Sequence, residues 1–279
     1  MCLIAFTLGQ SRHFPLVLAA NRDEFFNRPT RPMDWWRTHA GKPVLAGKDE
    51  RSGGTWLAVT PDGRVTAVTN VRESHTATSH HSRGELPLQA LTFDREAMFA
   101  SLADTAGDYA GFNLICLNTN QGWYYSNRDA HPGRNLFRGS YGLSNHLLQT
   151  PWPKLLRLRQ SVSDRVAEAG TNAQALHHQL ITLLQDPTAA PDHLLPDTGV
   201  GLETERFLSS PFITGTDYGT RATTVVTVDA SGYIRVSEQS WGPLAEKGEH
   251  RHFGWQRHAP GSDIIPEKFC HPTGGPDGR

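Results

Sequence analysis

The chain has 279 residues, 37% of them hydrophobic, and a formal net charge of −1 from 27 Lys and Arg against 28 Asp and Glu. A chain of this length forms one large domain or two small ones and buries a core without disulfides or metal. The balanced charge argues against a nucleic-acid groove or a polybasic membrane patch, and the composition excludes disorder along the whole chain.

Three cysteines, Cys2, Cys116 and Cys270, are far apart in the sequence and form no Cys-x-x-Cys pair. We therefore expect neither a disulfide framework nor a cysteine zinc site. No apolar run approaches the roughly 20 residues that cross a bilayer. The amino-terminus also lacks the basic segment of a secretory signal. These features predict a cytoplasmic protein with no integral membrane segment.

Short apolar runs predict that the chain begins with strands. Residues 2–7 and 16–20 form the first expected hairpin, and the charged residues 21–32 are expected to be a loop or a short helical turn. Residues 55–60 and 64–70 flank a Pro-Asp-Gly sequence, which favours a hairpin turn.

The middle of the chain changes from strand patterns to helical ones and back. One or two helices are expected within 87–103, with Asp94 as a helix N-cap. Strand patterns then return at 112–118, 123–126 and 139–144.

Two helices are predicted next. Apolar residues recur at helical spacing over 153–169, and Gly170 is expected to end that helix. Thr171 or Asn172 would then cap a second helix over 173–184.

The carboxy-terminal third begins with an irregular, proline-rich stretch at 186–196, and a strong hairpin follows at 223–228 and 233–239. Many strands with helices grouped in the middle, and no strand–helix alternation, favour an α+β layered fold. We expect a single domain over 1–258 and a disordered carboxy-terminal tail over 259–279.

Cys2 directly follows the initiator methionine, and this position gives it a special chemistry. Methionine aminopeptidases remove Met1 when the next side chain is small, so the mature chain is expected to begin with Cys2. Its thiol and free α-amine would then share one carbon, and both titrate near neutral pH. The amine can take the thiol proton, as in N-terminal nucleophiles. The alternative is that Cys2 is a small buried residue of the first strand.

A polar tetrapeptide, Asn21-Arg22-Asp23-Glu24, follows the second expected strand. In a hairpin these residues emerge beside the start of the first strand, where Cys2 lies. A carboxylate there would hold the α-ammonium, and an arginine would favour the thiolate. The alternative is a charged turn with a local ion pair.

Several further motifs occur in order between residue 1 and about residue 241. They are Phe25 and Arg28-Pro29 after the tetrapeptide, Gly53-Gly54-Thr55-Trp56-Leu57, Thr69-Asn70-Val71-Arg72, Ser82-Arg83-Gly84, Tyr141-Gly142-Leu143-Ser144-Asn145 with Thr150-Pro151-Trp152-Pro153-Lys154, and Tyr218-Gly219-Thr220-Arg221. Together with Cys2, these motifs resemble the NRDE-motif family, which is the Transport and Golgi organisation protein 2 family.

That family is similar in pattern to the cysteine branch of the Ntn hydrolases, the bile salt hydrolases and penicillin V acylases. The resemblance implies a four-layer αββα sandwich of two antiparallel sheets, with Cys2 at the start of a central strand. It also implies that Asp23 holds the α-amine, that Asn145 lies near the oxyanion and that Arg221 lies beside the nucleophile. The local alternatives are a turn or cap residue for Asn145 and a strand-edge ion pair for Arg221.

The sequence departs from the amidases at one position. They carry an arginine three residues before the aspartate, and here that position is Ala20. Arg22 is adjacent to Asp23 instead, and neighbours on an extended strand face opposite ways. We therefore expect Arg22 not to reach the thiol.

Histidines gather in three places, at His75, His80 and His81, at His177 and His178, and at His250 and His252. The last two could share a strand face, but no carboxylate or cysteine completes a metal set, so surface histidines and no bound metal are predicted. The family resemblance implies a link to haem trafficking, which leaves a haem ligand among the histidines as an open alternative.

Two functions follow. The first is an N-terminal-cysteine hydrolase acting on C–N amide or thioester bonds of an acyl substrate, with no cofactor. Its expected catalytic residues are Cys2, Asp23, Asn145 and Arg221, and its expected substrate-binding residues are Asn21, Arg22 and Glu24. The alternative is a non-catalytic haem, acyl-CoA or lipid binding and trafficking protein that uses the same pocket.

Overall fold

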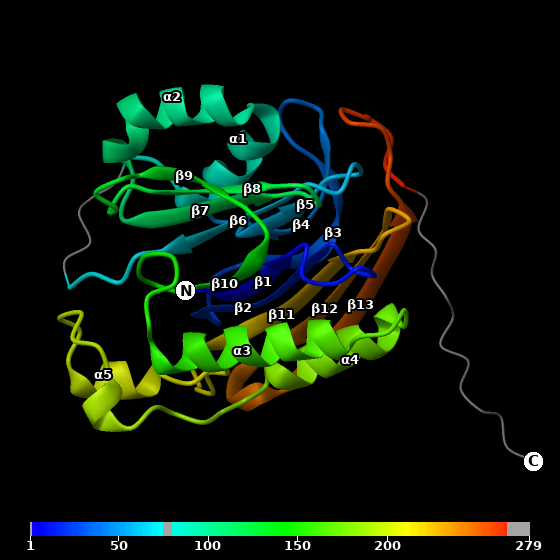
Figure 1. Cartoon of the computed structure of the whole chain (residues 1–279). Helices are drawn as coiled ribbons and strands as arrows, with labels where there is room; N and C mark the ends of the chain where they lie inside the picture. Colours follow the sequence, from blue (N-terminus) through cyan, green and yellow to red (C-terminus); the bar gives the residue numbers. More distant parts are fainter. Residues whose placement is uncertain (1, 75–79, 267–279) are drawn as a thin grey trace, which may run out of the picture.

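The computed structural model of the protein describes residues 2–74 and 80–266. Two antiparallel sheets lie face to face with helices outside each of them (Figure 1), which confirms the expected α+β class and its four layers. The helices are α1 (Leu86–Thr92), α2 (Arg95–Thr105), α3 (Pro153–Glu168), α4 (Ala173–Leu183) and α5 (Leu202–Phe207). The first two cover one sheet, and α3 and α4 cover the other (Figure 1).

The sheet beneath α3 and α4 is six-stranded. Its strands, in spatial order, are β10 (Gly139–Leu143), β1 (Cys2–Leu8), β2 (Leu16–Phe25), β11 (Tyr218–Val228), β12 (Tyr233–Trp241) and β13 (Lys247–Gln256). The other sheet is seven-stranded and follows chain order. Its strands are β3 (Thr30–Arg37), β4 (Pro43–Asp49), β5 (Leu57–Val59), β6 (Val65–Asn70), β7 (Phe112–Leu117), β8 (Gly122–Ser126) and β9 (Gly133–Leu136).

Strand β1 is buried along its whole length because it has a core on each face. Its alternate residues Cys2, Ile4 and Phe6 belong to the core between the sheets, while Leu3 and Ala5 belong to the core beneath the helices. A strand covered on both faces reads as a continuous apolar run rather than an alternating one. The apolar start of the chain is therefore the signature of a central strand.

The two predicted long helices are confirmed. In α3, Leu155, Leu158 and Val162 recur at helical spacing and pack on the helix-side face of β1 and β2. Helix α4 begins after Asn172, whose side chain accepts a hydrogen bond from the main-chain nitrogen of Ala175 at 3.0 Å.

Residues 21–32 are not the loop that their charge predicts. Strand β2 continues to Phe25 and β3 begins at Thr30, so the Asn-Arg-Asp-Glu tetrapeptide lies inside a strand. The reason is tertiary, because β2 pairs with β1 on one side and with β11 on the other, as far as the Phe25–Tyr218 pair. These ladders satisfy the main chain of a segment whose side chains are polar.

Several elements have no periodic pattern in the sequence and were not predicted, namely β3, β4, β9, β13 and α5. Three of them, β3, β9 and β13, are edge strands. Edge strands commonly carry charged residues, which discourage pairing with other molecules and erase the apolar alternation.

The expected tail begins after β13. Within its first residues, Asp263 accepts a hydrogen bond from Lys42 Nζ at 2.9 Å, and its carbonyl oxygen accepts one from Arg37. The remainder of the predicted tail, 267–279, lies outside the described residues, as does His75. Each helix in the described part of the chain is too short or too polar to cross a membrane.

Candidate active site at the start of strand β1

The Cys2 thiol points from the first residue of β1 into the space between the sheets. The side chain is 7% exposed and belongs to the inter-sheet core. Beside it lies a cavity of about 10 Å³ whose walls include Arg22, Trp56 and Ala67. A space of that size holds about one water molecule.

Arg22 lies on the same face as the thiol, which corrects the expectation that it would not reach it. Residues directly opposite each other on antiparallel strands share a face, and Cys2 is paired with Arg22. The alternation of neighbours holds, so Asp23 is the residue that faces away. The Arg22 guanidinium stacks on Trp56 at 4.2 Å from the ring centroid, and its Nη2 lies 3.8 Å from Glu24 Oε2.

A second cation, Arg83, lies near the thiol. Arg83 is in the short 3₁₀ helix η1 (Arg83–Glu85) and donates a hydrogen bond to the carbonyl oxygen of Gly111 at 3.1 Å. Burial lowers the pKa of Arg83, and the negative charges of Glu24 and of a Cys2 thiolate oppose that change. Sequence reasoning noted the Ser-Arg-Gly motif but assigned Arg83 no role.

The charges around Cys2 act in both directions on its pKa. Burial raises the pKa of the thiol, and the carboxylates of Asp23 and Glu24 raise it further, while Arg22 lowers it. A thiolate here therefore depends on positive charge close by.

Asp23 faces the helix layer at the amino-terminal end of β1. Because Cys2 is opposite Arg22, the next residue of β2 lies beside the main-chain nitrogen with which β1 begins. An Asp23 carboxylate oxygen accepts a hydrogen bond from Thr220 Oγ1 at 2.7 Å. Burial raises the pKa of this carboxyl, and the nearby Lys154 ammonium lowers it.

Lys154, on the first turn of α3, is a buried cation that sequence reasoning missed. Its Nζ donates a hydrogen bond to the Leu208 carbonyl oxygen at 2.6 Å, and burial lowers its pKa to about 8. The Thr-Pro-Trp-Pro-Lys motif was the available signal, but a lysine after a helix start more often indicates a solvated face.

Asn145 lies just beyond β10, the other neighbour of β1. The ladder between β1 and β10 ends at the Ile4–Leu143 pair, and Asn145 follows two residues later at the end of the sheet where β1 begins. The side chain is fully buried, and its Nδ2 donates to Asn70 Oδ1 at 3.0 Å. An amide from each sheet therefore meets near the start of β1.

Arg221 is engaged elsewhere. It occupies an irregularity in the β2–β11 pairing, and its Nη1 donates to the carbonyl oxygens of Phe25 at 3.0 Å and Arg28 at 2.6 Å. These bonds hold the turn between β2 and β3. Arg22, rather than Arg221, is therefore the arginine on the Cys2 face of the sheet.

Asn21 and Glu24 differ in what they contact. The Asn21 amide donates to the carbonyl oxygens of Leu184 and Pro211 at 2.7 and 2.9 Å, which ties β2 to the chain after α4. Glu24 is half-buried and lies 3.9 Å from Arg28 Nε, so it belongs to the charged group around Arg22.

A buried ion pair lies on the helix side of the site. Arg72 pairs with Glu205 of α5, its guanidinium lies 4.9 Å from the ring centroid of Trp152, and two of its nitrogens, Nε and Nη2, have no acceptor in the described part of the chain. Tyr218 lies nearby, and its hydroxyl has no partner there either. Both residues fall in motifs noted in the sequence, but nothing local indicates that they are buried.

The histidines form a separate group. His177 is buried, with hydrogen bonds to Ser237 Oγ at 2.8 Å and Thr227 Oγ1 at 2.9 Å, so the prediction of surface histidines is wrong for this residue. His250 and His252 do share a strand face, with ring centroids 4.1 Å apart. Within 2–74 and 80–266, no group of three or more histidine, cysteine or acidic side chains could hold a metal ion.

Comparison with known proteins places the chain in a family. The family model described as Transport and Golgi organisation 2 matches residues 1–243. The chain belongs to this family. The Transport and Golgi organization protein 2 homolog of Bos taurus is 36% identical over 263 residues, covering 86% of this chain and 93% of that protein. The homolog of Homo sapiens is 35% identical over 262 residues with the same coverage.

A solved structure shares the fold. The C2A mutant of the conjugated bile acid hydrolase from Clostridium perfringens aligns with a TM-score of 0.51 over 97% of each chain, at 9% sequence identity. This member of the Transport and Golgi organisation 2 family thus shares its fold with that hydrolase, as the motifs led us to expect.

Proposed function

We propose that this protein is an N-terminal-cysteine hydrolase that cleaves the C–N amide or thioester bond of an acyl substrate. The observation that carries the proposal is the surroundings of Cys2. Its thiol begins a central strand, Arg22 lies on the same face, and the Asp23 carboxylate lies at the amino end of the strand.

Removal of Met1 would leave a free α-amine on the carbon that carries the thiol. This amine takes the thiol proton, and the thiolate attacks the substrate carbonyl carbon. The tetrahedral oxyanion collapses as the C–N or C–S bond breaks and the leaving group takes the proton. A water molecule, deprotonated by the amine, then attacks the thioester, which releases the acid and restores the thiol.

The surrounding charges suit these steps. Arg22 and Arg83 favour the thiolate, and Asp23 holds and orients the α-ammonium. We assign the Asn145 amide as the side-chain donor for the oxyanion, which requires one of its two N–H groups to leave its hydrogen bond with Asn70. One such donor contributes roughly 3–4 kcal/mol to transition-state stabilisation.

Access to the thiol is narrow. The cavity of about 10 Å³ admits a water molecule, so an acyl group reaches Sγ only when the stacked pair of Arg22 and Trp56 moves aside. Trp56 is half-buried, so part of its side chain faces solvent and can move in that direction.

The test compares two cysteines. Cys2→Ala and Cys116→Ala variants are assayed with a panel of N-acyl amides and acyl thioesters, and intact mass shows whether Met1 is removed. Cys116 is the matched control because it is buried in β7 and burial raises its pKa to about 12. We expect turnover to disappear only in Cys2→Ala. Equal turnover by Cys2→Ala and wild type, or retention of Met1 on most chains, would end the proposal.

A further inference from the structure

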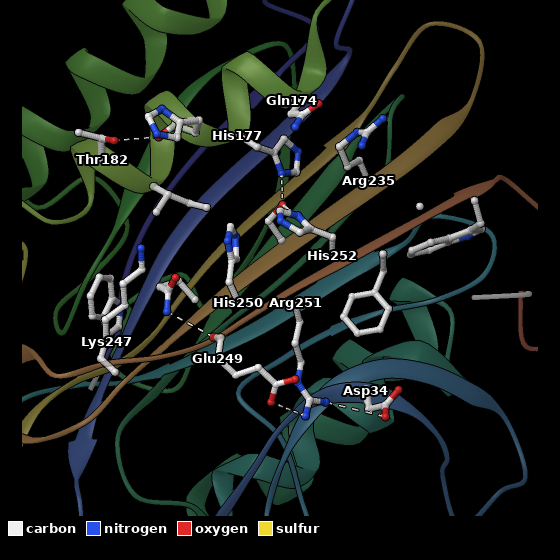
Figure 2. A pocket seen from close by; sticks show the side chains of 18 of the residues that line it. Asp34, Gln174, His177, Thr182, Arg235, Lys247, Glu249, His250, Arg251 and His252 are labelled. Carbon is white, nitrogen blue, oxygen red and sulfur yellow. Dashed lines mark hydrogen bonds and ion pairs between the residues drawn. The ribbon is translucent and has the colours of Figure 1, made fainter. Parts of the chain in front are cut away.

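A large groove lies far from Cys2 in the sheet order, between α4 and the outer strands β12 and β13 (Figure 2). Its volume is about 840 Å³, within the range of small-molecule sites. Helix α4 packs on β11 and β12, while β13 continues beyond it as the edge of the sheet. The groove therefore forms where α4 stops covering the sheet and the edge strand β13 extends beyond it.

The floor of the groove is polar, which is unusual for a sheet face beside a packed helix. Cross-strand pairs place Ser237 of β12 beside His252 of β13, and Gln239 beside His250. The next pair in the same row joins Arg235 to a glycine. A face that served only to pack against α4 would carry apolar side chains here.

The side chains of the floor are basic, with Arg235 and Lys247 charged and the two histidines able to take up protons. Arg235, His250, His252 and Lys247 line the groove, and the acidic residues that line it, Asp34 and Glu249, both lie within 4.0 Å of a different arginine, Arg251. Figure 2 shows these three charged residues grouped together, away from Arg235 and His252. Arg235 and Lys247 are left without a counter-charge from the lining residues.

Arg235 is the clearest sign of a missing ligand. Its guanidinium carbon lies 5.7 Å from the ring centroid of Tyr233, it makes no ion pair or hydrogen bond with any described residue, and its Nε is buried without an acceptor. Buried N–H donors almost always have a partner, because an unmade hydrogen bond is costly. Arginine also presents a planar fork that matches phosphate and carboxylate oxygens.

His252 is oriented toward the same space. Its Nδ1 is hydrogen-bonded to Ser237 Oγ at 2.9 Å, and Ser237 is held in turn by the buried His177. These contacts fix the ring and leave Nε2 for a ligand. Figure 2 shows Arg235, His252 and Gln174 of α4 gathered at this end of the groove, with His250 beside them.

We propose that the groove is a binding site for a small organic phosphate, held by Arg235, His252 and His250, with its organic part against Ile181 and Trp241. Several cationic donors suit the several anionic oxygens of a phosphate, and the apolar lining suits an attached organic body. The site is separate from Cys2 and does not depend on hydrolysis there.

Proton linkage gives the site a signature. Partial burial in the groove, together with His252, Lys247 and His178, lowers the pKa of His250 to about 4, and partial burial and then Arg235 lower the pKa of His252. The negative charge of a phosphate bound between these side chains raises the pKa of both histidines. Its binding therefore takes up protons, and its affinity rises as the pH falls from 8 to 6.

The experiment is calorimetric titration of the full chain with phenyl phosphate and, as the matched carboxylate, benzoate, at pH 6 and pH 8. We expect saturable binding of phenyl phosphate that is tighter at pH 6, and weaker binding of benzoate. Arg235→Ala should weaken it about tenfold, the loss of one charge-assisted contact. His250→Ala, an exposed edge-strand change, should weaken it too, while Arg165→Ala on the outer face of α3 should not.

Two further results decide the matter. Cys2→Ala should bind phenyl phosphate like wild type, which separates this site from the proposed hydrolase site. The proposal would be overturned if phenyl phosphate showed no saturable binding at millimolar concentrations. It would also be overturned if Arg235→Ala and His250→Ala bound phenyl phosphate as tightly as wild type, or if benzoate bound as tightly as phenyl phosphate.

Discussion

Glu238 is a carboxyl buried between the sheets, and its replacement by glutamine tests the electrostatics of this interior. The side chain is 1% exposed, and one oxygen, Oε1, accepts a hydrogen bond from the main-chain nitrogen of Met33 at 2.7 Å. Thr224, the cross-strand partner of Glu238 on β11, lies close to this carboxyl, and its side chain lowers the carboxyl pKa. Burial raises the pKa of Glu238 from 4.5 to about 7, although Arg251 and Arg22 oppose the rise.

The sign of the effect follows from proton binding. Between pH 4.5 and about 7, the folded chain keeps the Glu238 proton that the unfolded chain has released. The free energy of unfolding therefore falls as the pH rises through this window, by a total of about 3 kcal/mol, and stays low above it. Glutamine keeps the acceptor for Met33 and never ionises, so Glu238→Gln should escape this loss.

Urea unfolding of the two proteins at pH 5, 6, 7 and 8 measures the effect. We expect Glu238→Gln to gain about 2.5 kcal/mol over wild type between pH 5 and pH 8, because part of the total is already lost below pH 5. Other titrating groups cancel in this difference. Glu203→Gln, an exposed change on α5, is the matched control and should show a constant difference. A constant difference for Glu238→Gln as well would refute the reasoning.

Three other predictions concern the site and the core. Trp56→Ala should speed alkylation of Cys2 by iodoacetamide several-fold at neutral pH, measured by peptide mass mapping, because it removes the wall of the narrow cavity; an unchanged rate would show that Trp56 does not limit access. Glu205→Gln should cost about 3–5 kcal/mol in urea unfolding, because Arg72 stays buried with its charge uncompensated, and a loss near zero would contradict this. Leu158→Ala should cost about 2–5 kcal/mol in the same assay, and a smaller loss would mean that the core beneath α3 collapses around the gap.

Local patterns in the sequence were enough for the elements whose burial is periodic. The apolar spacing that predicted α3 around Leu155 and Leu158 is a property of the helix itself, as is the Asn172 cap of α4. The same holds for β1, whose unbroken apolar run records its two covered faces. Edge strand β13 shows no such apolar pattern, because its solvent-facing residues make no contacts that repeat along the strand.

The candidate site is mixed in the same way. The place of Cys2 at the chain start and the order of the motifs were visible in the sequence, and the register of β1 brings Asp23 and Asn145 toward it. The burial of Arg72 was not visible, because its partner Glu205 is 133 residues away in the chain. Ion pairs of this kind leave no local pattern.

Local patterns in the sequence determined an α+β layered fold, a first strand that begins at Cys2 and the helices α3 and α4, since each depends on neighbours along the chain, while the four layers and the central place of that strand were implied by the family resemblance. Only the tertiary structure decided that Arg22 rather than Arg221 stands beside that sulfur, and that Arg235 and His252 share a groove. Side chains alternate across a strand with a period of two, so which of them meet depends on how strands are paired. That pairing is made between segments distant in the sequence, and no single segment contains it.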